Sequence, residues 1–188
     1  MAEYAEHEVI QGCLKKDRVY EEYLYKKYYS LFLAVCARYG RNMQDAKQLL
    51  NDGFVRIFMS IGTFRNEGSF EGWMRKIMVN TCLEYLKSSE FKKGNHTIHK
   101  EVIEDNTKHA VYNEAISNIN TNDLIALLQS LPSVTRTVFN LFVFEDYTHN
   151  EIAALLHMST GTSHWHVHHA RKILQQLIVT KNKLYEQQ

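Results

Sequence analysis

The carboxyl-terminal part of the chain concentrates side chains that suit contact with nucleic acid. From Ile152 to Tyr185 there is no acidic residue, whereas the same stretch holds four Lys or Arg residues and five of the ten histidines. Basic side chains attract phosphate, and exposed histidines donate hydrogen bonds to it. The stretch therefore predicts a basic surface whose positive charge increases as its histidines become protonated.

The apolar spacing of this stretch predicts a helix from Thr160 to about Val179. Its core side is expected to hold Val167, Ala170, Ile173, Leu174 and Leu177. Trp165 and Lys172 fall on the opposite face, and an outward tryptophan among polar neighbours suits the thymine methyl groups of a DNA major groove. The alternative is that Trp165 packs on the linker or on another domain.

A second short helix precedes this one and makes the DNA interpretation the stronger of the two. Thr148 and Glu151 have the spacing of a capping box, which predicts a helix over Asn150–Leu156. A turn at His157–Ser159 then leads into the long helix, and the whole pattern is typical of a helix-turn-helix.

The sequence gives little support for metal binding, catalysis or a phosphate-binding loop. His164 and His168 stand one helical turn apart, but no nearby carboxylate or cysteine completes a metal site. No nucleophile has a base beside it, and no glycine-rich loop suits a phosphate. We therefore expect no catalytic residue, no metal, no cofactor and no small-molecule substrate.

The apolar pattern in the rest of the chain predicts further helices, which are expected to pack around two separate hydrophobic cores. Apolar residues at three- and four-residue steps predict helices over 19–39 and Asn42–Ile61, and Ser69 is expected to cap a third. A short helix over Asp123–Ser130 and another that begins at Pro132 precede the helix-turn-helix. The fold class expected is all-α, with two small helical domains.

Composition sets the remaining limits. The chain has 188 residues, of which 45% are hydrophobic, so it can bury one core or two small ones. Its polar middle part favours a flexible linker over 89–120, between domains at 1–88 and 121–188, and the sequence leaves open whether about Val111–Ile119 forms a short helix there. No apolar run is long enough to span a membrane. Cys36 and Cys82 fall in apolar patterns as buried thiols, which fits a reducing cytoplasm.

Two segments resemble the sigma-70 superfamily. Leu131–Leu174 (LPSVTRTVFNLFVFEDYTHNEIAALLHMSTGTSHWHVHHARKIL) looks like its region four, and Asp45–Phe58 with Phe64–Lys87 looks like its region two. Two such regions joined by a variable linker resemble the extracytoplasmic-function (ECF) sigma factors. The resemblance implies a transcription initiation factor that binds core RNA polymerase, recognises the promoter −10 and −35 elements and helps to melt the DNA.

The resemblance also implies residue roles. The surface for core polymerase would comprise Asp45, Gln48, Leu49, Asn51, Asp52 and Arg56. The −10 strand would meet Phe64, Asn66, Trp73, Arg75, Lys76, Asn80 and Lys87. The −35 duplex would meet Thr160, Thr162, Ser163, His164, Trp165, His166, His169, Arg171 and Lys172. Several members carry Lys or Arg where this chain has histidine, so weaker, more pH-sensitive phosphate binding is expected. Members usually have glycine in the turn where this chain has His157, so a positive φ is expected there, which histidine tolerates better than a β-branched residue does.

The partners implied are core RNA polymerase and promoter DNA, in the cytoplasm at the nucleoid, and the resemblance allows for an anti-sigma factor. Two other classes stay open. A stand-alone helix-turn-helix transcriptional regulator would bind duplex DNA tightly without polymerase. A protein-interaction module would use the basic helix to hold a protein partner.

Overall fold

The computed structural model describes residues 4–89 and 121–185, and every regular element in those two ranges is helical. This confirms the all-α expectation. The chain forms two compact units, with helices α1 to α4 in the first and α6 to α9 in the second. Most of the proposed linker, with the segment Val111–Ile119, lies outside the described residues.

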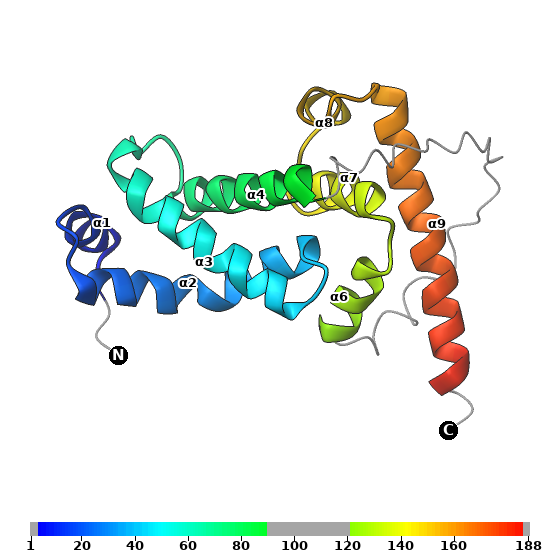
Figure 1. Ribbon diagram of the computed structural model, residues 1–188, viewed down its shortest axis with the longest axis horizontal. Helices are drawn as coiled ribbons and strands as arrows, with labels where there is room; N and C mark the ends of the chain where they lie inside the picture. Colours follow the sequence, from blue (N-terminus) through cyan, green and yellow to red (C-terminus); the bar gives the residue numbers. More distant parts are fainter. Residues whose placement is uncertain (1–3, 90–120, 186–188) are drawn as a thin grey trace. The chain divides into compact units, whose positions relative to one another are not determined.

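Three long helices make the core of the first unit. They are α2 (Arg18–Tyr39), α3 (Met43–Ser60) and α4 (Phe70–Ser89), which pack on one another in all three pairs (Figure 1). Each begins at a side-chain cap, because Asp17, Asn42 and Ser69 accept hydrogen bonds from backbone amides of the first turn at 2.9–3.0 Å. The predicted helices are thus confirmed to within a residue or two at their starts.

The core of this unit is aromatic and sulfur-rich. Phe32 and Phe54 meet with ring centroids 5.9 Å apart, and Met74 and Met78 are fully buried from α4. Gly53 permits the close approach of α3 and α4, because a Cβ there would lie 2.3 Å from the sulfur of Met78. Cys36 and Cys82 are fully buried, as expected, with their sulfur atoms 4.0 Å apart and not joined in a disulfide.

One helix, α1 (Glu6–Leu14), was not predicted from the sequence. Only Val9, Gly12 and Cys13 of this helix are buried, so its apolar stripe is too narrow to stand out. Gly12 lies against the ring of Tyr20, where a Cβ would come within 2.2 Å of ring carbons. A short 3₁₀ turn, η1 (Ile61–Thr63), follows α3 and also packs against α1.

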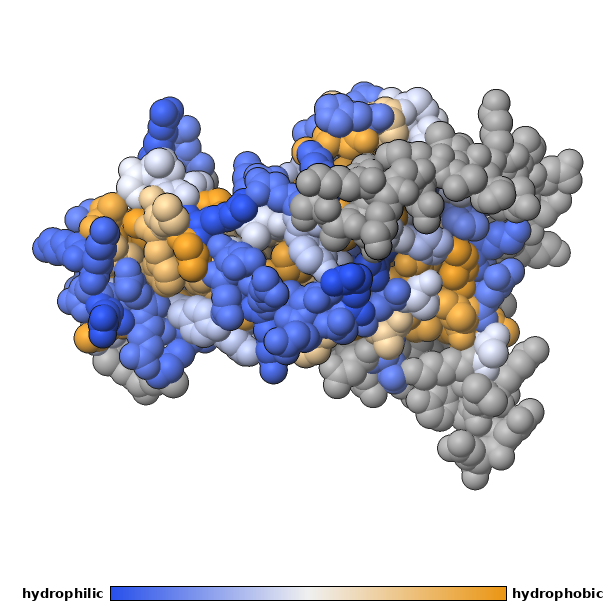
Figure 2. Space-filling view, viewed as in Figure 1, coloured by the Kyte–Doolittle hydropathy of each residue, from blue (hydrophilic) through white to orange (hydrophobic). Residues whose placement is uncertain are grey.

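The second unit comprises α6 (Thr121–Gln129), α7 (Ser133–Val143), α8 (His149–Leu156) and α9 (Thr160–Tyr185). Pro132 is the N-cap of α7 rather than its first residue, and α9 extends six residues beyond its predicted end at Val179. Val138, Leu141, Ile152 and Ala170 are fully buried between the helices. Figure 2 shows hydrophobic residues along α6 and α9, where Leu124 and Val179 are partly exposed.

Candidate nucleic-acid interface

The turn between α8 and α9 has the geometry of a helix-turn-helix. The Thr148 hydroxyl accepts from the Glu151 amide, and the Glu151 carboxylate accepts from the Thr148 amide at 2.8 Å, which completes the expected capping box. His157 ends α8 in the left-handed region at φ 54°, as expected. Ser159 then accepts from the Thr162 amide at 3.0 Å and starts α9.

The outward face of α9 follows from its buried one. Ser163, Val167 and Ala170 are buried, so at about 100° per residue the residues farthest from the core lie on the opposite side. Those residues are Gly161, Trp165, His168 and Lys172. His168 therefore belongs to this face, although it was not among the predicted contacts. The i, i+3 spacing from Trp165 was the signal that could have identified it.

Trp165, on the outward face of α9, forms the centre of an aromatic group that continues onto one flank of the helix. Its indole stacks on the ring of His169, with centroids 4.7 Å apart and planes at 15°, and meets the ring of His166 edge-on at 4.9 Å. Trp165 and His169 are each half-buried. These contacts hold the indole in place while part of it stays open to a partner.

Two of the predicted −35 contacts turn toward neighbouring helices of the unit instead, and this corrects their predicted roles: Ser163 is buried and His166 is half-buried. Ser163 is fully buried, and its hydroxyl lies 2.9 Å from Nδ1 of His149 on α8. His166 turns toward α7, where its Nδ1 lies 3.0 Å from the Thr135 hydroxyl. Burial, with a smaller contribution from His169, lowers the pKa of His166 to about 4. His166 is therefore neutral at physiological pH and adds no charge for phosphate.

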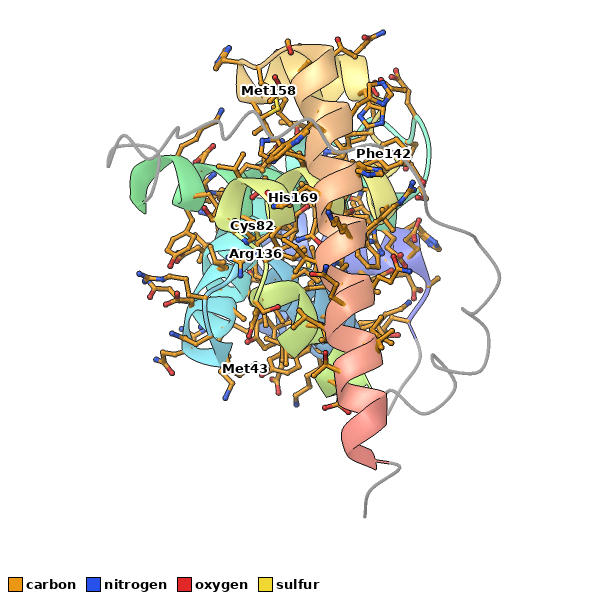
Figure 3. All side chains as sticks on the ribbon, turned by 90° about the vertical axis from the view of Figure 1, so that its right-hand side faces the viewer. Met43, Cys82, Arg136, Phe142, Met158 and His169 are labelled. Carbon is orange, nitrogen blue, oxygen red and sulfur yellow. The ribbon has the colours of Figure 1, made fainter. Side chains whose placement is uncertain are left out.

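The other flank of α9 carries a column of rings. Phe142 stacks on His149 at 4.3 Å, and His149 meets the exposed His164 at 3.6 Å. Figure 3 shows Phe142 and His169 on opposite sides of α9, so the two ring groups occupy separate flanks. Burial, then His164 and Arg171, lower the pKa of His149. Arg171 and Lys172 are both exposed.

The two predicted threonine contacts lie at the start of α9. The Thr160 hydroxyl donates to the Asn150 side chain at 3.2 Å, and the Thr162 hydroxyl lies 2.8 Å from that of Ser159. Both threonines are half-buried. Their methyl groups and hydroxyls are thus placed at the first turn of α9, which in a helix-turn-helix contacts base edges.

In the first unit, the loop after η1 presents an aromatic group. The half-buried ring of Phe64 lies 5.1 Å from Phe70 and 5.6 Å from Trp73, and Trp73 stacks on the buried Phe70. Asn66 stands exposed at φ 57°, a conformation that asparagine adopts more readily than most residues. The loop thus combines an accessible ring surface with an exposed amide.

The structure brings most of the predicted α4 contacts onto one face. Lys76, Asn80 and Lys87 are exposed and lie within about 60° of Trp73 around the helix. Arg75 lies about 200° from Trp73 and is half-buried, with its guanidinium 3.8 Å from Glu71. Arg75 is therefore separated from the other predicted −10 contacts.

A cavity of about 220 Å³ opens beside this loop. Phe64 and Asn66 line it from the loop, and Glu6, His7 and Gln11 line it from α1. The aromatic and amide groups that were predicted to hold a base thus border a real hollow, one wall of which belongs to a helix that sequence reasoning missed.

The α3 surface is exposed at Gln48, Asn51, Asp52 and Arg56. Arg56 pairs with Glu84 of α4 at 2.6 Å, which lowers the pKa of Glu84. Asp45 is half-buried and accepts from Arg41 and Tyr85 at 2.8 and 2.7 Å, and these bonds lower its pKa.

Leu49 corrects the prediction for α3, because its side chain is only 2% exposed and packs in the core. It belongs to the apolar stripe of α3 rather than to its surface. Two other apolar residues lie on the exposed surface of α3: Val55 is 56% exposed and Met59 is 82% exposed. Apolar residues that fall outside the core stripe were the signal that could have identified them.

Among the described residues, no three His, Cys, Asp or Glu side chains converge to hold a metal ion. Within the same ranges, no helix combines the length and the apolar character that a bilayer span requires.

Comparison with protein families gives two matches, in order along the chain. Residues 24–91 match the model of Sigma-70 region 2, and residues 121–174 match that of Sigma-70, region 4. Together the matched residues make up more than half of the chain.

Relatives and solved structures agree with these matches. The chain is 21% identical to the RNA polymerase sigma-H factor of Pseudomonas aeruginosa, over 90% of this chain and 91% of the relative. It is 26% identical to the ECF RNA polymerase sigma-E factor of Haemophilus influenzae, over 82% and 85%. Among solved structures, the sigma factor RpoE of Bartonella quintana, in complex with the anti-sigma factor NepR, is 18% identical with a TM-score of 0.50. That match covers 82% of this chain and 96% of the other and supports the fold alone.

Proposed function

The chain belongs to the sigma-70 family and is an RNA polymerase sigma factor of the ECF type, and we propose that its two units divide promoter recognition between them. The first unit binds core polymerase and the −10 element, and the second binds the −35 element. The single observation that carries this proposal is the presence of regions 2 and 4, in that order, on one chain.

The −35 contact is assigned to the outward face of α9. Trp165, His168 and Lys172 form its centre, with His164 and Arg171 on one flank and Thr162 and His169 on the other. Trp165 supplies an apolar surface for thymine methyl groups, while Arg171 and Lys172 neutralise phosphates. Thr160 stays in the proposal at the first turn. Ser163 and His166 act as positioning residues that hold α9 against α8 and α7.

The −10 contact is assigned to the 62–69 loop and the exposed face of α4. Phe64 and Asn66 offer stacking and hydrogen bonds to an unstacked base of the separated strand. Lys76, Asn80 and Lys87 track the strand along α4, with Trp73 at the near end of that face. The placement of Arg75 near Glu71 supports a more peripheral role for it.

The polymerase contact is assigned to the exposed side of α3. Gln48, Asn51, Asp52 and Arg56 give it polar groups, and Val55 and Met59 give it apolar ones. Apolar groups at the centre of a polar rim are the usual composition of a protein interface. Asp45 contributes at the start of the helix, where its bonds to Arg41 and Tyr85 fix it.

The proposed domain boundaries remain 1–88 and 121–188, with 89–120 as a linker. A flexible linker lets the two units reach elements separated along the DNA, and it lets an anti-sigma factor hold them in another arrangement. The chain acts as a specificity subunit rather than an enzyme, and its place of work is the cytoplasm, at the nucleoid.

Reconstitution tests the proposal. The full chain is added to core polymerase from its own cell, and transcripts are mapped on a library of genomic fragments. Promoter-dependent transcripts are expected only when the chain is present. A complete lack of such transcripts on every fragment would contradict the proposal.

The same assay separates the alternative, a stand-alone regulator. Its support is the helix-turn-helix itself, which by its geometry can enter a groove without polymerase. A regulator would bind its duplex tightly alone and would not need polymerase for sequence selection. The sigma factor is expected to show sequence-specific binding chiefly in the holoenzyme.

A further inference from the structure

We propose that α1 completes a pocket for one unstacked nucleobase of the −10 strand, and that Glu6 makes this pocket prefer bases with an exocyclic amino group. The inference rests on the proposed function and extends it to residues that neither the resemblance nor the family match assigns. The matched region begins at residue 24, so all of α1 lies before it.

The position of α1 is determined by close packing. Val9 and Cys13 are 3% and 2% exposed, and Gly12 lies directly against the Tyr20 ring. The ring of Tyr4, just before α1, meets those of Tyr20 and Tyr23 at 4.9 and 5.0 Å. A helix anchored in this way can serve as a wall, because its exposed side keeps a constant position relative to the loop after η1.

The lining of the cavity matches what an unstacked base requires. The half-buried ring of Phe64 offers a stacking surface on one side, and Ile10 adds an apolar contact from α1. Glu6, Gln11 and Asn66 place polar groups around the same hollow, where the edge of a base needs partners. An aromatic ring and several hydrogen-bonding groups in the same lining distinguish this hollow from a purely apolar groove.

The size of the hollow also fits. Its volume of about 220 Å³ lies below the roughly 300–1,000 Å³ of pockets for drug-sized ligands. One planar ring system is therefore a better occupant than a larger molecule. The pocket borders the loop whose Phe64 and Asn66 are assigned to the −10 strand, so a base of that strand is within reach.

Glu6 decides the expected preference. A carboxylate only accepts hydrogen bonds, so it favours a base edge that donates. Adenine, cytosine and guanine each carry an exocyclic amino group on the edge used for pairing, whereas thymine carries only its N3–H there. That N3–H lies between two keto oxygens, which repel a carboxylate that approaches it. The pocket is therefore expected to disfavour thymine.

The test uses the holoenzyme and a promoter that it transcribes, with the −10 element randomised. Open complexes are selected, and the non-template strand is sequenced. At one position the wild type is expected to enrich amino-bearing bases over thymine. Glu6→Gln is expected to reduce that enrichment about two- to tenfold, because the uncharged amide accepts more weakly from an amino group and can also donate to a keto oxygen of thymine.

Glu8→Gln is the matched control. Glu8 lies on the same helix and loses the same charge, but it faces the Ala5 amide at 3.1 Å rather than the cavity. Glutamine preserves that capping bond. Glu8→Gln is therefore expected to leave the base preference unchanged. Equal preferences for wild type and Glu6→Gln at every position would overturn the inference.

A second variant tests the pocket itself. Gln11 is exposed, so Gln11→Trp is expected to fold normally while its indole fills the cavity. Strand opening, followed by 2-aminopurine fluorescence in the −10 element, should fall at least about tenfold while polymerase binding is kept. If the Gln11→Trp holoenzyme opened the DNA strands normally, this result would overturn the inference but not the proposed function. Failure of the wild-type holoenzyme to transcribe any promoter would overturn the proposed function and the inference with it.

Discussion

Nδ1 of His149 lies 2.9 Å from the hydroxyl oxygen of Ser163, and this hydrogen bond joins the two helices of the helix-turn-helix. Ser163 is fully buried, whereas His149 lies between Phe142 and His164. The bond helps to fix the angle between α8 and α9, and it also fixes His149 in the ring column on the flank of α9. The proposed −35 surface therefore depends on His149 and Ser163, although neither residue is proposed to contact the DNA.

Ser163→Ala should therefore loosen the helix-turn-helix. The substitution leaves the ring nitrogen of His149 without this partner, at a cost of about 1–3 kcal/mol in the free energy of unfolding. Amide hydrogen exchange over α8 and the first turns of α9 measures the effect. Thr180→Ala is the control, because its hydroxyl bonds only to the Gln176 carbonyl of its own helix. Equal exchange rates in the two variants would contradict the expectation.

The second prediction concerns pH. His166 stays neutral in the folded state down to about pH 4, whereas in the unfolded chain it takes up a proton below about pH 6.5. The unfolded state therefore binds more protons in this window, and the stability of the second unit falls as the pH falls from 6.5 to 4, by at most about 3 kcal/mol.

His166→Asn checks this directly. The amide can still bond to Thr135 but does not titrate, so the variant should lose stability at pH 7 and show a flatter pH profile. Hydrogen exchange of α7 and α9 at several pH values gives the comparison. The difference between wild type and variant is expected to shrink toward pH 4, and a constant difference would refute the assignment.

The third prediction is that a substitution on the exposed face of α3 weakens polymerase binding without a large change in folding stability. Met59 is 82% exposed on α3, so Met59→Asp should change stability by less than about 0.5 kcal/mol. In the interface it would bury an unpaired charge, and polymerase affinity should fall at least about tenfold. Met43→Asp makes the same change at the start of α3, away from that face, and should bind normally. Fluorescence anisotropy with labelled chain measures both.

The fourth prediction concerns phosphate contact by α9. Lys172→Ala removes one charge from the outward face, so the slope of log K against log salt for binding of −35 duplex by the holoenzyme should become shallower by about 0.9. Gln176→Ala, an exposed neutral position one turn farther along, should leave the slope unchanged. An unchanged slope for Lys172→Ala would remove it from the interface.

Local pattern was enough to predict much of this molecule. The stripes of α2, α3 and α4, the capping box at Thr148 and the positive φ of His157 all depend on residues close together in the chain. Such features need only the helical period and the chemistry of caps and turns. The buried thiols of Cys36 and Cys82 followed from the same stripes.

Residues at the border between a buried and an exposed face were predicted less well. His166 was expected to face DNA, but Thr135 of α7 approaches it, and Ser163 is bonded by His149 of α8. Arg75 lies apart from the other predicted −10 contacts, close to Glu71. In the first two cases the deciding neighbour comes from another helix, and a single helix pattern carries no information about it.

The sequence by itself thus determined most of the helical segments, the apolar stripe of each, and the family that the ordered pair of regions indicates. Tertiary structure alone decided that α1 forms one wall of a cavity beside Phe64, and that His166 of α9 is neutral and turned toward α7. The physical reason is that periodicity depends on neighbours within a helix, whereas cavities and burial depend on side chains that distant segments bring into contact.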